Sequence, residues 1–487
     1  MNRTAQSIML LVSVLAALLG AWLTPRDELL AQDVAISESP AASAYRSPFA
    51  VVTSPDGKTI YATDQTGGRL SILDVASMTA CGEIELHGRP QGLALSNDGS
   101  TLYVAEHGAS SVAVIDTNKQ TITSRIAVGL WPTAVALGEQ SRRLYVANQD
   151  RDSISVIDLR QHPAKTITEI AVVREPSSLA LTPDERRIVV TNLMALGRGT
   201  DPTLSAVVSI IDTGTLAAAR SVKLPPGSTM VPGVAVSPDG KWAYVVHGLG
   251  RFNLPITQLE RGWVNTNALS IIDIAGGSRL ATLLLDDLMQ GAADPHSLVV
   301  SQDGKHLWIT HTGVHEVSSI DIGLVHELLE GNVPDDLASL KDGSQANIWN
   351  QVKHNREKIA DLENDLTGLY IAGVIHRFRA RWHRTLRAGS FPPMAKRLFV
   401  ANYFSVSVTV LDASTGSLQR YLAGSGTGPR LGGVGVIFAR RDAATISLMR
   451  VIYSASVSPM CSARRRRSCG FLKTSASMGL LSCRSSG

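Results

Sequence analysis

Four histidines in the second half of the sequence have the side chains and the spacing to bind a metal ion or a small polar ligand. They are His247, His296, His311 and His315, and three residues separate the last two. Neutral imidazole is the usual nitrogen donor to metals in proteins. A His-x3-His pair serves one ion only if both rings face inward, which a loop between strands does not guarantee. Three interpretations stay open: a metal or haem contact through His247, His296 and His311, a polar pocket for a small molecule or partner, and histidines that are solvated or bonded to a turn.

These histidines belong to a repeated pattern that extends through most of the chain. A short motif occurs seven times, at spacings of 42, 42, 44, 55, 64 and 91 residues. The copies are TIYATD, TLYVAE, RLYVAN, RIVVTN, WAYVVH, HLWITH and RLFVAN, anchored at Tyr61, Tyr103, Tyr145, Val189, Tyr244, Trp308 and Phe399. A period near 42 residues that lengthens only by insertion indicates a modular array.

Each copy has the same internal order of apolar runs and turns. An apolar run reaches a turn such as SPDG at 54–57, where Pro restricts the backbone and Gly relaxes it. The motif follows, then an alternating run that ends in Asp, then a closing run such as TSRIAVG at 123–129. Four short antiparallel strands per unit are the signature of a propeller blade. The sequence therefore predicts an all-β fold, a seven-bladed β-propeller with a helical insertion in blade six and an irregular C-terminal tail.

The repeat resembles the YVTN family of β-propellers over residues 46–424. Its motif is nearly verbatim at 145–148 and 399–402. Propellers of this type with a helical insert before the last blade are often followed by a c-type cytochrome module of the peroxidase kind, so the resemblance implies a possible redox relative. Because propellers support binding, scaffolding and catalysis alike, the resemblance predicts the fold more firmly than the function.

One polar residue follows each motif anchor by three positions. The set comprises Asp64, Glu106, Asn148, Asn192, His247, His311 and Asn402. We expect it to ring the propeller face where the chain leaves the second strand of each blade. Asn and Asp in this place commonly bond their own backbone in a turn, which is the structural interpretation. The binding interpretation keeps Asn148, Asn192 and Asn402 as candidates.

Three insertions distinguish the two faces of the predicted ring. Those at 195–205 and 249–267 follow second strands and should build up the first face, the one formed by the loops between strands 2 and 3 and the connections from strand 4 to the next blade. The second of them brings Arg251 and Trp263 near the histidines. Residues 323–378 follow a third strand and have a helical apolar pattern, so we expect them on the opposite face, as a buttress packed under the ring or as a partner-docking arm.

The two ends of the chain differ from the repeat. Residues 1–31 have a short basic start and an apolar core, which indicates a secretory signal peptide, or an uncleaved anchor, before a linker at 32–45. The tail at 425–487 has ten Arg and Lys against Asp442, a net charge of +9, whereas the whole chain has +4. We interpret this tail as disordered or frame-shifted, and residues 379–395, which carry four Arg and no acid, as translated out of frame between two compensating slips.

Motifs for catalysis or cofactor attachment are absent from the sequence. There is no C-x-x-C-H, so the chain as written cannot bind haem covalently, and no G-x-S-x-G, H-E-x-x-H or Walker loop. No folded basic face supports nucleic-acid binding, and no second segment could span a membrane after signal cleavage. No cofactor is expected as written; haem c would require a lost downstream module, and a metal stays possible.

Taken together, these features predict an exported binding or scaffold protein of the periplasm or cell exterior, without catalytic activity of its own. It would recognise a protein or small ligand on the face built by blades four to six. The alternative is a periplasmic redox or electron-transfer protein, the remnant of a propeller–cytochrome c fusion. A metal-dependent enzyme centred on the histidines is a third possibility.

Overall fold

The computed structural model describes residues 46–77, 79–252, 264–342, 345–379, 386–390, 397–403, 407–412 and 418–423. The predicted signal peptide, the linker, the C-terminal tail and part of the segment at 379–395 lie outside these residues. Among the described residues, no helix is both long and apolar enough to cross a membrane.

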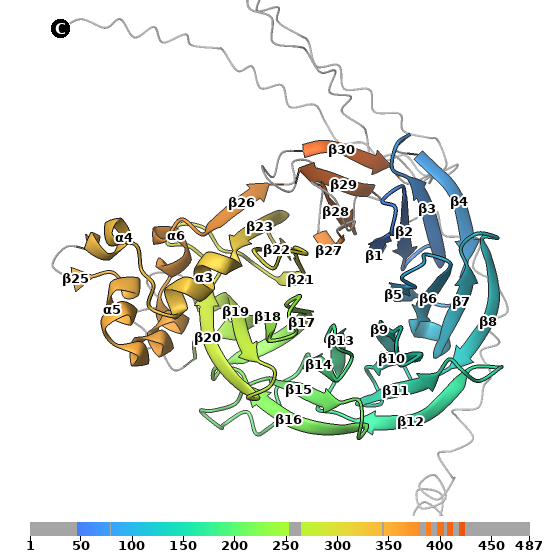
Figure 1. Cartoon of the computed structure of the whole chain (residues 1–487), viewed down its shortest axis with the longest axis horizontal. Helices are drawn as coiled ribbons and strands as arrows, with labels where there is room; N and C mark the ends of the chain where they lie inside the picture. The colour runs from blue at the N-terminus through green and yellow to red at the C-terminus, as the bar shows by residue number, and fades with distance from the viewer. Residues whose placement is uncertain are drawn as a thin grey trace, which may run out of the picture. The chain divides into compact units, whose positions relative to one another are not determined.

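Seven four-stranded antiparallel sheets surround a central axis (Figure 1). The innermost strands are β1 (Pro48–Thr53), β5 (Pro90–Leu95), β9 (Pro132–Gly138), β13 (Pro176–Leu181), β17 (Ser228–Val236), β21 (Pro295–Val300) and β27 (Leu386–Ser390). The second strands are β2 (Thr59–Asp64), β6 (Thr101–Glu106), β10 (Arg143–Asn148), β14 (Arg187–Asn192), β18 (Trp242–Gly250), β22 (His306–His311) and β28 (Arg397–Asn402). This arrangement confirms the all-β propeller that the repeat predicted.

The outer half of each sheet follows in chain order. The third strands are β3 (Arg69–Asp74), β7 (Ser111–Asp116), β11 (Ser153–Asp158), β15 (Val207–Asp212), β19 (Asn265–Asp273), β23 (Glu316–Asp321) and β29 (Ser407–Asp412). The outermost strands are β4 (Thr79–Glu85), β8 (Thr121–Ala127), β12 (Lys165–Ala171), β16 (Ala217–Lys223), β20 (Ser278–Leu284), β26 (Ile375–Arg379) and β30 (Leu418–Ala423). A short 3-10 helix, η2 (His107–Ala109), joins β6 to β7.

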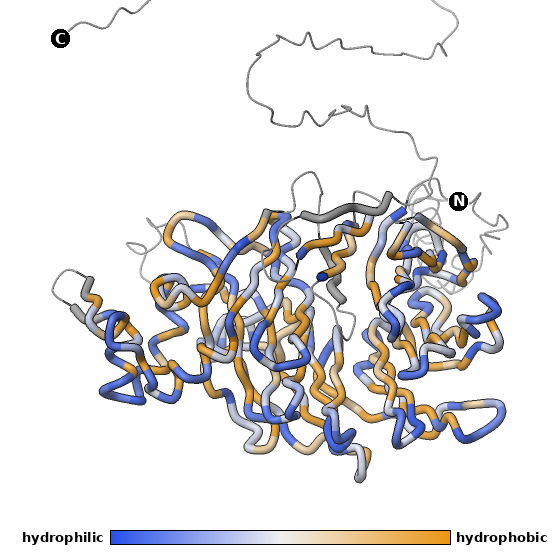
Figure 2. Tube along the Cα trace, turned by 45° about the horizontal axis from the view of Figure 1, so that its top comes forward, coloured by the Kyte–Doolittle hydropathy of each residue, from blue (hydrophilic) through white to orange (hydrophobic). Residues whose placement is uncertain are grey.

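Burial follows the position of a strand in its sheet. The second strands are almost entirely buried, which explains their continuous runs of β-branched and aromatic residues, whereas outer strands such as β4 alternate between exposed and partly or fully buried positions. Figure 2 shows hydrophobic stretches running through the strands and hydrophilic residues gathered in turns. The hydrophobic core therefore lies between blades.

The turn between the first two strands is built as the sequence predicted. In blade one, Asp56 accepts the N–H of Lys58 at 3.0 Å and the Ser54 hydroxyl at 2.5 Å. Gly57 has a φ of 68°, which an L side chain rarely adopts, and its N–H donates to the Ser54 carbonyl at 2.9 Å. Blade one therefore has a tight hydrophilic turn between its first two strands, on the opposite face.

The ring closes through contacts between blade one and the last sheet. Val51, Ile60 and Ala62 share one buried cluster with Phe399 and Val408. β27 packs between β1 and β21, and Leu386 pairs with Asn402 in its sheet. Part of the segment at 379–395 thus forms an innermost strand, although its sequence has no strand-like alternation. Residues 391–396 lie outside the described residues.

Five short elements with helical backbone connect β23 to β26. They are α3 (Ile322–Leu329), α4 (Asp335–Ser339), α5 (Ile348–His354), η3 (Arg356–Asn364) and α6 (Gly368–Ile371), with a two-stranded ribbon of β24 (Lys341–Asp342) and β25 (Gln345–Ala346). We call residues 322–371 the helical segment. Figure 1 shows it at the periphery of the ring beside β20.

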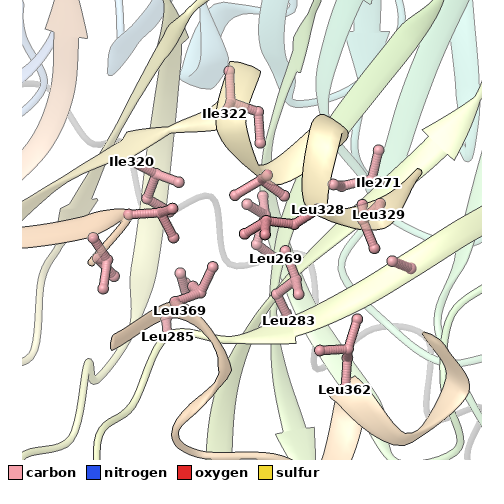
Figure 3. Packing of buried hydrophobic residues seen from close by; sticks show 14 of the residues in the cluster. Leu269, Ile271, Leu283, Leu285, Ile320, Ile322, Leu328, Leu329, Leu362 and Leu369 are labelled. Carbon is pink, nitrogen blue, oxygen red and sulfur yellow. The ribbon is translucent and has the colours of Figure 1, made fainter. Parts of the chain in front are cut away.

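The helical segment covers the outer edge of blade five, a correction to the expected position beneath the ring. β20 is buried from Ala281 to Leu284, whereas the equivalent strand of blade four, β16, exposes all but Val222. The segment contributes Leu328, Leu362 and Leu369 to the cluster that buries this edge (Figure 3). The apolar outer strand needs a cover, and the connection to β26 provides it.

Candidate functional site

The seven polar residues that follow the motif anchors are buried on the second strands of their sheets; six of them end the strand, and His247 lies within β18. Their side chains are at most 2% exposed: Asp64, Glu106, Asn148, Asn192, His247, His311 and Asn402. From the sequence we expected them to ring the first face, either bonded to their own turns or available for binding. The structure buries all seven side chains, so none of them presents its polar group at the surface of that face.

His311 is held by both of its ring nitrogens. Its Nδ1 lies 2.8 Å from the carbonyl oxygen of Ala292, and its Nε2 lies 2.7 Å from the hydroxyl of Ser318. A carbonyl can only accept, so Nδ1 carries the proton and Nε2 accepts from the serine. Burial lowers the pKa of His311 to about 3. The imidazole is therefore neutral near pH 7, and its one lone pair is occupied.

His247 repeats this arrangement in blade five. Nδ1 lies 3.1 Å from the carbonyl of Gly248 and Nε2 lies 2.9 Å from the Ser270 hydroxyl, which is 2.7 Å from that of Thr282. Burial lowers the pKa of His247 to about 4. The histidine thus links the second, third and fourth strands of its sheet. Within the described ranges, no three His, Cys, Asp or Glu side chains are grouped so as to hold a metal ion.

The three asparagines make the same kind of contact. Nδ2 of Asn148 donates to Ser155 at 2.8 Å, and Nδ2 of Asn402 donates to Thr409 at 2.8 Å, each on the third strand of the same sheet. Asn192 donates instead to the carbonyl of Val207 at 2.7 Å. These contacts favour the structural interpretation of the asparagines, because each amide joins two strands of one blade.

The two acidic members bind the chain that enters the blade. Oδ1 of Asp64 accepts the N–H groups of Ser47 and Gly67 at 2.7 and 2.9 Å. Glu106 accepts the N–H of His87 at 2.7 Å and forms an ion pair with Arg125 at 2.9 Å. Burial raises the pKa of Asp64. In each blade, the side chain at this position therefore links strands or loops through buried polar contacts, and its identity varies between blades.

The other predicted residues lie in different environments. His296 lies on the innermost strand β21, partly buried, with its ring edge-on to Phe49 at a centroid distance of 6.3 Å. His315 has a φ of 58° in the turn before β23. Trp263 lies outside the described residues. His296 borders the axis of the ring, whereas the His247 and His311 rings are enclosed within their blades.

Arg251 joins the first face to the helical segment. Its guanidinium donates to Asn364 Oδ1 and to the Glu363 carbonyl, both at 2.8 Å, and to Thr266 at 3.2 Å. The Glu363 carboxylate pairs with Arg279 at 2.7 Å, and burial lowers the pKa of Arg251. A cavity of about 190 Å³ lies here, lined by Pro225, Pro226, Leu249, Gly250, Arg251, Glu363 and Asn364. Arg251 therefore positions the helical segment beside a small cavity with a mixed polar and apolar lining.

Sequence reasoning missed a concentration of exposed hydrophobic side chains on the first face. Eleven large hydrophobic residues are exposed in the described chain, and nine of them lie in loops or strand ends of this face. The nine are Leu130, Trp131, Met194, Leu196, Met230, Phe252, Val264, Leu288 and Met289. The other two, Ile167 and Leu340, lie on an outer strand and in the helical segment. The signal was in the sequence, as apolar residues within predicted loops such as DDLMQG at 286–291.

These nine residues, which we call the apolar face residues, are unequally distributed. Two belong to the connection between blades two and three, where Trp131 stacks on His107 at a centroid distance of 5.6 Å. The other seven belong to blades four to six. Exposed hydrophobic surface is typical of interaction sites, so the seven side chains on three neighbouring blades make this part of the first face a candidate.

Comparisons with known proteins agree with the architecture. A family model described as a seven-bladed β-propeller lactonase matches residues 28–124 and 59–179. The β subunit of hydrazine synthase from Kuenenia stuttgartiensis is 34% identical over 109 residues, which is 22% of this chain and 28% of that subunit. A solved structure of Kuenenia stuttgartiensis hydrazine synthase superposes with a TM-score of 0.65 at 26% identity, covering 77% of this chain and 98% of the solved one.

The chain is a β-propeller similar to a hydrazine synthase subunit. The sequence match to the curated relative covers much less than two thirds of that subunit, whereas the structural match covers nearly all of the solved chain. The structural similarity therefore extends over most of the chain, whereas the sequence similarity to the curated relative covers 109 residues.

Proposed function

We propose that the chain is a non-catalytic binding or scaffold subunit that docks a partner protein on the first face of blades four to six. In this proposal it is a seven-bladed YVTN-type propeller with a helical segment before its last blade, exported to the periplasm or the cell exterior. The apolar face residues carry the proposal, because nine of the eleven large hydrophobics exposed in the described part of the chain lie on one face. The similarity to a protein named as a subunit supports it.

The buried histidines also favour binding over catalysis. His247 and His311 are neutral near pH 7 and have both ring nitrogens engaged within their own blades or loops. A metal ion would have to displace Ser270 or Ser318 to reach them. We therefore place the functional surface on the loops above these residues.

A triple substitution tests this proposal. Leu196→Ser, Phe252→Ser and Met289→Ser together remove apolar area at side chains that are 64%, 55% and 88% exposed, so the fold should be unaffected. The tagged protein is expressed in the cells from which the gene comes, and the protein that co-purifies with it in stoichiometric amount, which we call the companion, is identified. The companion should no longer co-purify with the triple variant. The matched control is Ile167→Ser with Leu340→Ser, which changes hydrophobics of 40% and 45% exposure elsewhere. Equal companion recovery from both variants would contradict the proposal.

A redox assembly is the second candidate function. The similarity to a subunit of hydrazine synthase favours it, since that name denotes an enzyme, and the YVTN resemblance includes relatives with cytochrome modules. In this case the propeller would support a haem-bearing partner. An absorption spectrum of the companion complex tests it: a Soret band that fractionates with the companion supports the candidate, and a companion without visible absorption excludes it.

A further inference from the structure

The loop between β20 and β21 carries the most exposed hydrophobic side chain of the described residues. Met289 is 88% exposed and its neighbour Leu288 is 56% exposed. We call residues 286–291 the knob loop. Both side chains stand out from the first face, next to the blade that bears the helical segment.

The base of the knob loop is fixed by a buried carboxylate. Asp286 is fully buried, and its Oδ1 accepts the N–H of Ala292 at 2.6 Å and the amide of Asn267 at 2.9 Å, while its Oδ2 accepts the backbone N–H of Asn267. These contacts tie both ends of the loop to strand β19. The loop is therefore anchored in the blade on each side of its tip.

The tip itself is closed by a second aspartate. Oδ1 of Asp287 accepts the N–H groups of Met289 and Gln290, both at 2.6 Å, and the Asp287 N–H donates to the Gln290 carbonyl at 3.1 Å. A side chain that caps its own turn in this way defines the backbone locally. The exposed side chains thus project from a turn of defined shape.

A cation on β26 holds the far side of the loop. Arg377 is only 9% exposed and donates to the carbonyls of Gln290 and Gly291 at 3.2 and 2.7 Å. It also pairs with the buried carboxylate of Glu316 at 2.5 Å. The hydroxyl of Tyr370 donates to the Leu285 carbonyl at 2.7 Å. Three parts of the fold therefore fix a loop whose outermost residues contact little.

We infer that the knob loop is a preformed docking element that inserts Leu288 and Met289 into an apolar socket of a partner protein with a basic rim. The inference rests on the proposed function and names the chemistry of the partner. A loop ordered before binding loses little conformational entropy on association, so its exposed hydrophobics contribute directly to affinity. The most exposed residue then lies at the centre of the contact, where binding energy is usually concentrated.

The acidic residues around the knob loop determine which charge on the partner protein is favoured. Asp287 and Asp294 are the acids at the surface of this loop and its exit, while Arg377 is paired with Glu316. The rim of the knob is therefore negative. It favours Lys and Arg on the partner and disfavours an anionic membrane surface.

Site-specific photocrosslinking tests the inference. Benzoylphenylalanine replaces Met289 in the tagged full chain, expressed in the cells from which the gene comes, and the crosslinked peptide is sequenced. The expected result is one discrete adduct whose peptide is apolar and flanked by Lys or Arg. Benzoylphenylalanine at Lys119, which is 75% exposed in a turn of the opposite face, is the control and should give no such adduct.

A second variant tests the acidic rim. Asp294→Asn removes the charge but keeps the size, and Asn tolerates the φ of 54° at this position. The adduct yield at position 289 should fall several-fold. An unchanged adduct yield would contradict the inference that the partner's socket has a basic rim.

The remaining outcomes separate this inference from the proposed function. An adduct with a second copy of this chain or with lipid overturns the inference. If Met289→Ser with Leu288→Ser keeps the companion while Leu196→Ser with Phe252→Ser loses it, the knob is wrong and the proposed function stands. If neither pair affects the companion, the proposed function fails as well.

Discussion

The hydroxyl of Ser318 lies 2.7 Å from Nε2 of His311 and joins the second and third strands of one sheet inside the ring. The opposite nitrogen donates to the carbonyl of Ala292, and burial of the ring keeps the imidazole neutral near pH 7. His311, which the sequence offered as a metal ligand, therefore links its strand to the neighbouring strand and to a loop. The stability of the ring consequently depends on the protonation state of a buried histidine.

Stability should fall as the solution is acidified, through His247 and His311. The pKa values in the folded protein are about 4 and about 3, below the ordinary value of 6.5. Between these values the unfolded chain binds more protons, so the free energy of unfolding rises with pH up to about 6.5 and is lost as pH falls toward the folded pKa values. Each histidine contributes a slope of at most about 1.4 kcal/mol per pH unit in this window.

Chemical denaturation between pH 4.5 and 7.5 measures that slope. The double variant His247→Asn with His311→Asn should have a shallower slope, because Asn does not titrate. His354→Gln, at an exposed position of α5, is the matched control. An identical slope for the double variant and the wild type would show that the two histidines do not carry the effect.

Arg125→Ala should destabilise the ring through Glu106. The carboxylate of Glu106 is fully buried and pairs with Arg125, whose side chain is 31% exposed. Removal of the cation leaves a buried charge that is stabilised only by hydrogen bonds. We expect a loss of about 3 kcal/mol, the lower end of the range for a broken buried pair, since Arg125 is partly exposed. Urea denaturation measures it.

The control for this prediction is a double-mutant cycle. Glu106→Gln removes the buried charge and keeps an oxygen that accepts the N–H of His87. Added to Arg125→Ala, it should restore part of the lost stability. Strictly additive losses from the two substitutions would argue against a charge interaction.

Gly233→Ala should strain the contact between blades five and six. A Cβ at Gly233 would lie 2.3 Å from the carbonyl oxygen of His296, a backbone atom that cannot move without the strand β21. We expect a loss of about 1–3 kcal/mol, as in other overpacked cores. Gly199→Ala, where a Cβ meets nothing within 4 Å, is the control and should be neutral or slightly stabilising in a thermal melt. Similar losses in both variants would indicate a backbone effect instead of the predicted clash.

The repeat predicted the blades well because strands and turns depend on neighbouring residues. Ser54, Asp56 and Gly57 form their turn without help from the rest of the chain. The burial of His311 could not be predicted in the same way, since it depends on Ala292 and on loops from other parts of the sequence. The sequence around a motif histidine does not show whether its ring is buried or exposed.

The helical segment illustrates the same limit over a longer range. Its apolar pattern was visible, but its position depends on the apolar outer edge of β20, which comes from a different blade. The contacts of Arg251 with Glu363 and Asn364 join residues more than 100 positions apart, with separations of 112 and 113. Loop connectivity alone therefore suggested the wrong side of the ring.

Trp349→Ala should release the helical segment from blade five without opening the ring. Trp349 is fully buried in the cluster that includes Leu283 and Leu362, and its Nε1–H donates to the Gly368 carbonyl at 2.5 Å. The substitution removes about 3–5 kcal/mol of local stability. Most helices of the segment are short and depend on tertiary packing, so this loss should expose residues 330–370 to limited proteolysis while the blades stay protected. Leu340→Ala, at a side chain that is 45% exposed, should leave the cleavage pattern unchanged. If Trp349→Ala instead unfolds the whole ring in one transition, the segment and the blades form a single cooperative unit, and the cover over β20 is as essential to the propeller as its own strands.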